Sequence, residues 1–390
     1  MIKLNKEELQ LASKINQLKD EAGSHSPSIF TLVKKIPELN VKVDACFLSN
    51  PYATDLFLSY LKEELVNTNK LRDVLEFYPS QNNVISELLA KNLCINKENI
   101  FIGNGAIEVI QAVLHNFVSK KIIVNIPTFS SYYEFVKKDT EVVYYQLKKE
   151  NNYSLIPEDY VEFVKKEKPD SVVIINPNNP DGQYIKYKNL RYILNELKDI
   201  KNIIIDESFI HFAFENNDYD LISATELVKE YNNVIVIKSM SKDFGIAGIR
   251  AGYGVMNKYK VASLLENGYL WNSSGLSEYF FRLYTRQDFL EEYEKVRVKY
   301  ILETQAFFKE LSAINHIKVY PGLANFVLIE LPEGTTSSDF VSKMLIKYGV
   351  YTRTCSDKIG LKGEYIRLAS RTKEENTVII KALNDIFVNE

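Results

Sequence analysis

The chain has 390 residues, of which 46% are hydrophobic and 25% charged, so it is a folded globular protein long enough for two domains. The formal net charge of −3 disfavours a nucleic-acid binder that works through a basic patch. No apolar run reaches the roughly 20 residues that cross a bilayer, so we expect no membrane partner.

The cysteines and histidines are scattered along the chain. The three cysteines, Cys46, Cys94 and Cys355, and the four histidines lack the spacing of a disulfide framework or a structural zinc site. This pattern predicts a cytoplasmic protein without a metal. The first twenty residues mix charges with apolar positions, which predicts an amphipathic helix and not a signal peptide.

From about residue 95, short apolar runs alternate with amphipathic segments. The predicted strands are 100–102, 121–126, 141–146, 171–175, 202–205 and 234–237. Helices are predicted between several of them, at 106–117, 131–138, 187–199 and 223–230. This rhythm predicts an α/β domain around a mostly parallel sheet.

After Tyr253 the pattern changes to that of a small α+β domain. A long amphipathic segment covers about 277–311, and it is followed by strands at 317–320, 324–330, 350–353 and 365–369, a helix at 338–348 and a closing helix from about 373. We therefore divide the chain into an N-terminal arm with helices (1–90) that contributes to the substrate site and the small domain, a large domain (91–275) and a C-terminal small domain (276–390).

Polar residues follow the predicted strands where an open parallel sheet binds ligands, beyond the C-terminal strand ends. Gly105 and Ala106 open a helix after the first strand, and free N–H groups there favour a phosphate, although a plain strand-to-helix turn has the same sequence. The loop 176–182 contains two prolines and three asparagines. These features predict a binding site at this edge.

Two further strand ends carry ionisable groups. Asp206 ends a buried strand, where an unpaired carboxylate is costly, so we expect a cationic partner for it. Ser239, Ser241 and Lys242 follow the next strand, and Arg250 comes eight residues later. A lysine in this place is a potential amine nucleophile, and the hydroxyls and the arginine are phosphate ligands.

The order of Asn179, Asp206, Ser239-x-x-Lys242 and Arg250 resembles the cofactor site of fold-type I pyridoxal-phosphate enzymes of the class I/II aminotransferase family. The resemblance extends from about residue 23 to the end of the chain. It implies a large domain with a mostly parallel sheet flanked by helices, a small α+β domain, and pyridoxal 5′-phosphate as cofactor.

The resemblance also implies a role for each matching residue. Lys242 would bond to the cofactor aldehyde and move a proton at the substrate Cα, Asp206 would pair with the pyridine nitrogen, and Asn179 would bond to O3′. Phe129 would stack on the pyridine. The cofactor phosphate would be held by Gly105, Ala106, Ser239, Ser241, Arg250 and, from the neighbouring subunit, Tyr78, which implies a homodimer.

Two subgroups of the family are compatible with the sequence: histidinol-phosphate aminotransferases, and decarboxylases of threonine phosphate or serine phosphate. Phe209 stands where the aminotransferases usually place a tyrosine, and segments 320–326, 353–355 and 365–368 look like the decarboxylase pattern. His25 lies where the decarboxylases carry a histidine on an N-terminal arm. We therefore expect decarboxylation of L-serine phosphate to ethanolamine phosphate, or of L-threonine phosphate to 1-aminopropan-2-ol phosphate. The alternative is transamination of a small phosphorylated substrate with glutamate as amino donor.

A distal substrate phosphate calls for cationic groups and N–H donors. The candidates are Arg353 and His25 for the phosphate and Arg367 for the carboxylate or for both anions. Asn50 loosely resembles the family's substrate-proximal asparagine. Asp181 departs from the family, because it replaces a common threonine and would place a carboxylate near an anionic cofactor.

Overall fold

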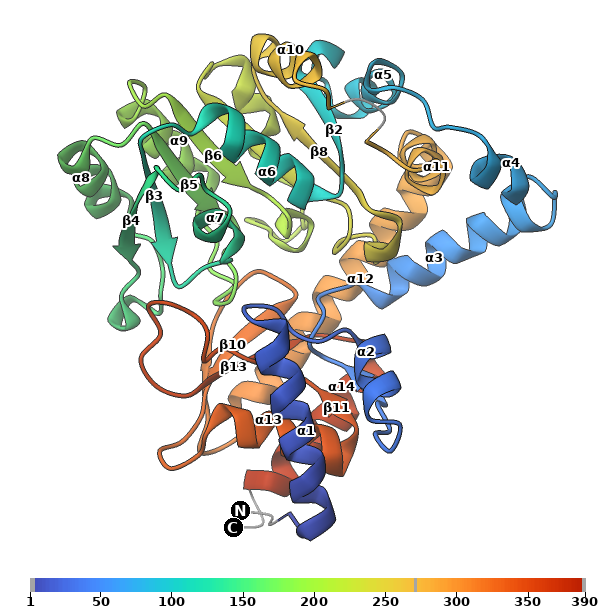
Figure 1. Ribbon diagram of the computed structural model, residues 1–390, viewed down its shortest axis with the longest axis vertical. Coiled ribbons are helices and arrows are strands. Elements are labelled where there is room, and N and C mark those ends of the chain that lie inside the picture. The colour runs from blue at the N-terminus through green and yellow to red at the C-terminus, as the bar shows by residue number, and fades with distance from the viewer. Residues whose placement is uncertain (1–3, 270–271, 388–390) are drawn as a thin grey trace.

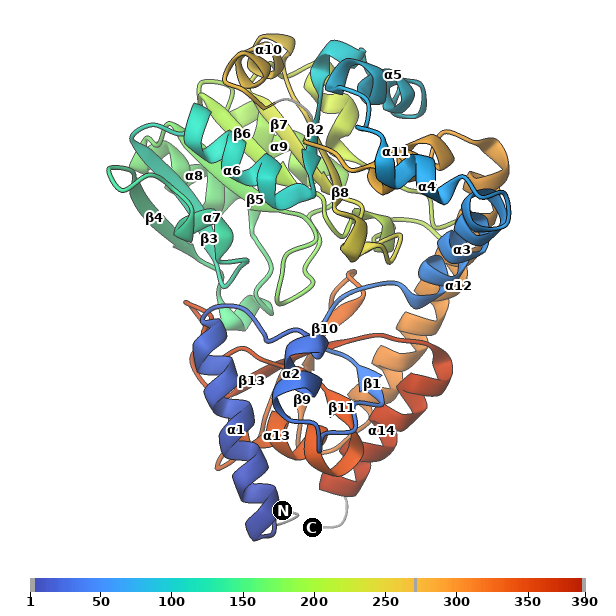
Figure 2. The same ribbon diagram turned by 45° about the vertical axis from the view of Figure 1, so that its right-hand side comes forward.

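The computed structural model describes residues 4–269 and 272–387. Figure 1 shows an upper half built around a large sheet and a lower half built around a smaller one. The long helix α12 (Gln287–Ser312) passes from one half to the other, and α1 (Lys6–Ala22) lies along the lower half with its C-terminal end near the junction (Figure 2).

The large sheet has seven strands in the order β2-β8-β7-β6-β5-β3-β4. All are parallel to one another except β8, which is antiparallel to β2 and β7. In chain order the strands are β2 (Ile100–Asn104), β3 (Lys121–Ile126), β4 (Glu141–Gln146), β5 (Ser171–Ile175), β6 (Asn202–Asp206), β7 (Val234–Ser239) and β8 (Ala251–Val255). The expected mostly parallel sheet is confirmed.

Helices cover both faces of this sheet. One core packs α6 against the strands, and a second core packs α8 and α9 against the other face, so the strands are buried on both sides. The helices are α6 (Ala106–Phe117), α7 (Ser131–Glu134), α8 (Pro157–Glu167), α9 (Tyr187–Glu196) and α10 (Lys258–Glu266). The predicted helix at 131–138 ends after four residues, and that at 223–230 is a 3₁₀ helix, Ala224–Lys229.

The lower half contains an antiparallel sheet in the order β12-β13-β10-β9. Its strands are β9 (Lys318–Tyr320), β10 (Phe326–Glu330), β12 (Arg353–Thr354) and β13 (Tyr365–Ala369), and α13 (Ser337–Tyr348), α14 (Lys373–Phe387) and α12 pack on it. The strand predicted at 350–353 is two strands, because β11 (Val350–Tyr351) pairs instead with β1 (Val43–Asp44). The segment predicted at 277–311 is likewise divided, into α11 (Gly275–Leu283) and α12.

The N-terminal region divides between the halves. The predicted amphipathic helix is α1, which packs on α13, and α2 (Ile29–Lys35) and β1 also join the lower half. Next come α3 (Pro51–Leu61), a π-helical turn (Lys62–Val66), α4 (Leu71–Glu76) and α5 (Asn82–Leu93), of which α5 contacts β2. The proposed boundaries at residues 90 and 275 stay a prediction. Within the described ranges, no helix combines the length and apolarity needed to cross a membrane.

Candidate active site

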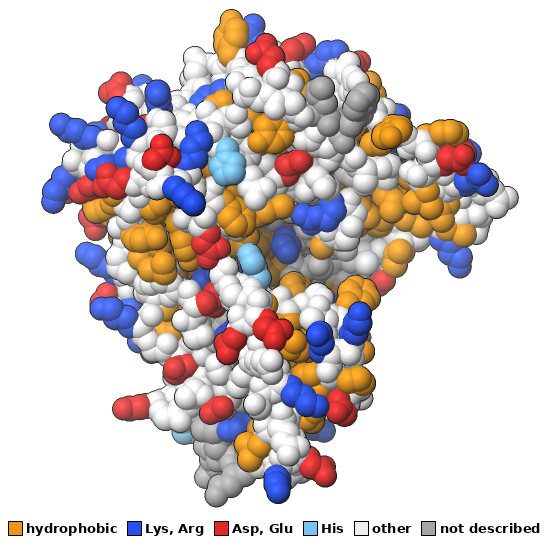
Figure 3. Space-filling model, in the orientation of Figure 1, with side chains coloured by type: hydrophobic (Ala, Val, Ile, Leu, Met, Phe, Trp, Pro, Cys, Tyr) orange, Lys and Arg blue, Asp and Glu red, His pale blue; other side chains and the backbone are white. Residues whose placement is uncertain are grey.

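A cavity of about 280 Å³ lies between the two halves. Figure 3 shows a hollow in the middle of this face, with basic and histidine side chains at its mouth. The cavity is lined by both halves and by the segment after α1. The sequence-predicted residues in its wall are His25, Ala106, Phe129, Asn179, Asp206, Ser239, Ser241, Lys242, Arg250, Arg353 and Arg367.

Lys242 follows β7 and lies in the cavity wall. Its backbone carbonyl accepts a hydrogen bond of 2.9 Å from the N–H of Asn50, which fixes the turn that carries it. Burial, with the positive charges of Arg367 and Arg250, lowers the pKa of Lys242 to about 8. A substantial fraction of the side chain is therefore the neutral, nucleophilic amine in mildly alkaline solution.

The lowered pKa of Lys242 predicts how fast a cofactor aldehyde attaches to cofactor-free protein. The rate should rise about tenfold per pH unit up to the pKa of about 8 and then level off, because only the neutral amine reacts. Absorbance after stopped-flow mixing measures this rate. The Arg250→Met variant should shift the plateau to higher pH, since it removes a nearby positive charge. A wild-type rate that is still rising above about pH 10, as for an ordinary lysine, would contradict the prediction.

The carboxylate of Asp206 is held rigidly at the end of β6. One oxygen accepts the N–H of Ser208 at 2.8 Å, and the other accepts the hydroxyl of the buried Tyr132, also at 2.8 Å. Burial raises the pKa of Asp206, as expected for a carboxylate with no ion-pair partner among the described residues, so the cationic partner stays a prediction. Tyr132 could not be predicted from the sequence, because its contact depends on how α7 packs against the sheet.

The start of α6 forms a cradle for an anion. Gly105 is the N-cap residue with φ 77°, and a Cβ added there would lie 2.5 Å from Nη2 of Arg250. A Cβ on Gly252 would lie 2.5 Å from the backbone nitrogen of Ala106. The glycines thus let Arg250 and β8 approach the helix end, whose first N–H groups bind anions. The glycines also explain why β8 was not predicted. Every second residue of this strand is a glycine, so the strand lacks the alternation of apolar side chains by which strands are recognised in a sequence.

Arg367 connects the two halves across the cavity. It reaches from β13 to donate to Oδ1 of Asn179 and to the carbonyl oxygen of Cys46, both at 2.8 Å. Its Nε is buried and has no partner among the described residues. Burial and the nearby Arg353 lower the pKa of Arg367 to about 10, so it stays a cation at neutral pH. The guanidinium therefore places a positive charge in the cavity wall.

Asp181 does not line the cavity, which corrects the expectation that its carboxylate lies beside the cofactor. It is fully buried and accepts hydrogen bonds from Nδ2 of Asn178 at 2.5 Å and from the N–H of Gln183 at 2.9 Å. Burial raises its pKa to about 7. The carboxylate therefore closes the 176–183 turn on itself, and the turn presents Asn179 to the cavity.

Arg353 fastens the N-terminal arm over the site. It donates to Oγ of Ser26 and to the carbonyl oxygen of Ser24, both at 2.8 Å. The ring of His25, between these two residues, lies 6.4 Å from the ring of Phe129. The N-terminal arm and the C-terminal arginines therefore lie together at the cavity. The wall also contains residues that the sequence analysis did not single out: Ser24, Ser26, Cys46, Phe47 and Lys358.

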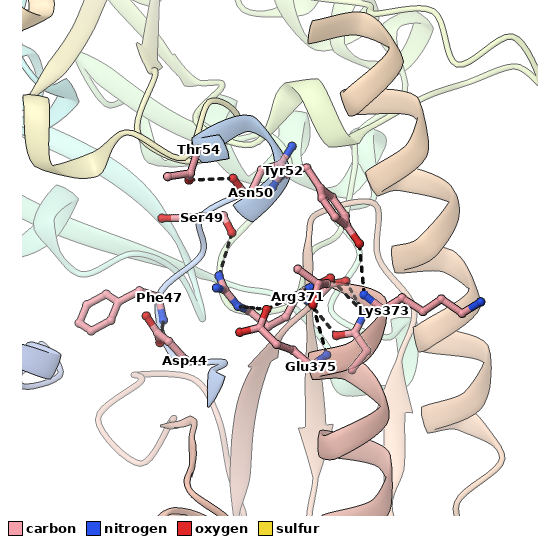
Figure 4. Close-up of polar contacts among 12 residues, drawn as sticks. Asp44, Phe47, Ser49, Asn50, Tyr52, Thr54, Arg371, Lys373 and Glu375 are labelled. Atoms are coloured by element: carbon pink, nitrogen blue, oxygen red, sulfur yellow. Dashed lines mark hydrogen bonds and ion pairs between the residues drawn. The ribbon is translucent and has the colours of Figure 1, made fainter. Parts of the chain in front are cut away.

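Asn50 and Tyr78 lie outside the cavity lining. Asn50 is buried and caps α3, because its Oδ1 accepts the N–H groups of Tyr52 and Ala53. Figure 4 shows the segment before α3, where Arg371 donates to the carbonyl oxygen of Ser49. Asn50 thus shapes this segment and the Lys242 turn. Tyr78 is 90% exposed, and its predicted contact with a neighbouring subunit stays a prediction.

Lys238, outside the cavity lining, connects the segments that follow β6 and β7. Its buried Nζ donates to the carbonyl oxygen of Glu207 at 3.1 Å and forms an ion pair with Asp243. Glu207 follows Asp206 and Asp243 follows Lys242, so a single ammonium group holds both functional residues in place. No cluster of three or more histidine, cysteine or acidic residues that could hold a metal ion occurs in 4–269 and 272–387.

Comparison with known families gives a match over residues 48–383 to aminotransferase class I and II. The chain belongs to this family. It is 66% identical over 387 residues to an L-serine phosphate decarboxylase of Campylobacter jejuni, with 99% of each chain covered. It is 31% identical over 330 residues to a histidinol-phosphate aminotransferase of Methanococcus aeolicus, with 84% and 85% covered. A solved decarboxylase structure from Sulfurospirillum multivorans superposes with a TM-score of 0.94 at 48% identity, with 98% of each chain covered.

Pyridoxal 5′-phosphate is the cofactor of this family, and the cavity fits it. Lys242 and Asp206 both line it, so Lys242 would supply the amine for the cofactor aldehyde and the Asp206 carboxylate the acceptor for the ring nitrogen. The glycine-walled start of α6, with Arg250, suits its phosphate. The expected family, fold and cofactor are therefore confirmed.

Proposed function

We propose that this chain is a pyridoxal-phosphate-dependent decarboxylase that converts L-serine phosphate to ethanolamine phosphate and carbon dioxide. The observation that carries the proposal is the 66% identity, over 99% of both chains, to a protein named L-serine phosphate decarboxylase. The cationic wall of the cavity agrees with a substrate that has two anionic groups.

The bound cofactor supplies an electron sink for the charge that develops at the substrate Cα. The protein's part is to orient the substrate so that the Cα–carboxylate bond stands perpendicular to the cofactor ring. Arg353 and His25 hold the distal phosphate, and Arg367 holds the carboxylate or both anions. Lys242 delivers a proton to Cα after carbon dioxide leaves, and its pKa of about 8 suits proton transfer near neutral pH.

L-threonine phosphate differs from L-serine phosphate by one methyl group, which a pocket distinguishes by only about 1–3 kcal/mol. The choice of serine phosphate rests on the name of the 66% identical relative. We therefore expect turnover of both esters, with a preference for L-serine phosphate.

Transamination is the alternative, and the 31% identical histidinol-phosphate aminotransferase keeps it open to test. Phe209 favours decarboxylation: it lines the cavity and packs edge-to-face on Phe326, with ring centroids 4.9 Å apart, so this position offers no tyrosine hydroxyl to the cofactor. The deciding experiment supplies the holoenzyme with L-serine phosphate and no keto acid. We expect carbon dioxide and ethanolamine phosphate, with the cofactor kept in its aldehyde form. Conversion of the cofactor to its amine form without carbon dioxide would overturn the proposal.

We also propose that the protein acts as a cytoplasmic homodimer, with Tyr78 reaching the cofactor phosphate of its neighbour. Exposed apolar side chains on α3, at the end of the π-helical turn and around the end of α4 support a subunit interface in this part of the chain: Leu58, Val66, Leu75 and Phe77. Apolar side chains also gather over α3 and α4 in Figure 3. The three cysteines are free, which agrees with a reducing compartment. Sedimentation should give about twice the chain mass of 45.0 kDa.

A further inference from the structure

Lys358 is a buried cation in the active-site wall that the proposed mechanism does not yet use. It lies in the loop between β12 and β13, lines the cavity and is 6% exposed. The arginines at the same end, Arg353 and Arg367, are 6% and 7% exposed. Three cations are thus gathered in one wall, and burying them without anions is costly.

The charges in this wall do not balance. Asp357 is the carboxylate in contact with the cluster, with one oxygen 2.8 Å from Nη2 of Arg353 and 3.3 Å from Nζ of Lys358. One negative charge against three positive charges leaves two in excess. Lys19, which contacts Ser356 from α1, is outside the cavity lining and partly exposed, so solvent screens it. In the proposed mechanism Arg367 also holds the substrate carboxylate, so the phosphate depends on Arg353 and Lys358. A phosphate monoester carries about −1.5 to −2 at pH 7, so it is attracted to Lys358 more strongly than a monoanion is.

The loop holds Lys358 in a fixed position. Its N–H donates to the carbonyl oxygen of Cys355 at 3.0 Å, and Nε2 of Gln146 in the upper half donates to the carbonyl oxygen of Gly360 at 3.1 Å. Gly360 has φ 92°, and a Cβ there would lie 3.1 Å from the backbone of Ile126. Both halves of the molecule therefore position this loop, and the ammonium group of Lys358, which has three N–H donors, lies 3.3 Å from the carboxylate of Asp357 in the cavity wall.

We propose that Lys358 determines specificity for a dianionic head group, by supplying the positive charge that a phosphate ester satisfies and a monoanionic ester does not. The inference rests on the proposed function, since it concerns the distal group of the same substrate. Arg353 donates hydrogen bonds to oxygens of Ser24 and Ser26. Arg367 donates hydrogen bonds to oxygens of Asn179 and Cys46. Lys358 contacts Asp357, and its other donors are available to the ligand.

The test compares L-serine phosphate with L-serine O-sulfate, a monoanion of nearly the same shape, on the holoenzyme. The wild type should prefer the phosphate ester in kcat/KM. In Lys358→Met the preference should fall about 10- to 100-fold, mainly through KM for the phosphate ester, as expected for one charge-assisted hydrogen bond. Lys358→Arg should restore most of it, because it keeps the charge. Lys362→Met, an exposed lysine of the same loop, is the matched control and should behave as wild type.

Binding gives a readout that does not depend on turnover. Calorimetry with ethanolamine phosphate and ethanolamine sulfate should show the same loss of discrimination in Lys358→Met and its recovery in Lys358→Arg. An unchanged phosphate-to-sulfate ratio in an active Lys358→Met enzyme would overturn the role of Lys358 and leave the decarboxylase intact. Absence of carbon dioxide from the wild type would instead overturn the proposed function, and calorimetry would still test the dianion site.

Discussion

The Lys242→Ala enzyme is expected to lose decarboxylation by at least about 10⁴-fold, because in the proposed mechanism this one side chain supplies both the amine for the cofactor and the proton for Cα. Lys242→Arg should be as inactive as the alanine variant, although it keeps the positive charge. A guanidinium has a pKa above about 12 and offers no neutral amine, whereas burial and two neighbouring arginines hold the pKa of Lys242 at about 8. The loss of activity in Lys242→Arg therefore tests the role of Lys242 as nucleophile and proton carrier, and not the role of its positive charge.

Carbon dioxide release from L-serine phosphate measures this loss. The mass of the protein after borohydride reduction should increase by one reduced cofactor in the wild type and in a Lys362→Met control, and should not change in either Lys242 variant. Retention of more than about one per cent of the wild-type turnover by Lys242→Arg would refute the assignment, because a nucleophile that is replaced costs far more than 100-fold.

The strand ends could be predicted from the sequence, and most of the cofactor half of the site followed from them. Asp206 and Ser239 are the last residues of β6 and β7, and Asn179 follows β5 by a short loop. Carboxyl ends of adjacent parallel strands meet at one edge, so the order of polar residues along the chain translates into proximity. All three residues line the same cavity.

The contacts between the halves could not be predicted in the same way. Lys358 and Tyr132 reach the site through the packing of a loop and a four-residue helix, and neither has a periodic pattern or a spacing that marks it. Asp181 illustrates the opposite error. Its place in the sequence suggested a carboxylate beside the cofactor, but Asn178 and Gln183 supply nearer donors, and the side chain turns into its own loop.

Among the residues that connect the two halves, Arg367 is expected to have the largest effect on kcat/KM for the substrate. Arg367→Met should lower kcat/KM for L-serine phosphate by about 10²- to 10³-fold, because the loss of a buried, hydrogen-bonded charge costs about 2–5 kcal/mol. It removes the anion partner and also the two bonds, each of 2.8 Å, that hold Asn179 and the Cys46 carbonyl in place. Arg367→Lys should recover little, since one ammonium on a flexible stem does not reproduce a planar fork that meets two acceptors at once.

The kinetic pattern distinguishes this role from general damage to the fold. We expect KM to rise in both Arg367 variants and kcat to fall as well, because Asn179, the proposed partner of the cofactor O3′, loses its bond to Arg367. Arg191→Met is the matched control: its guanidinium forms a surface ion pair of 2.7 Å with Glu230, which solvent screens, so kcat/KM should stay near the wild-type value. An Arg367→Lys enzyme with wild-type KM would show that charge alone suffices at this position, and the two-acceptor geometry would then have no part in substrate binding.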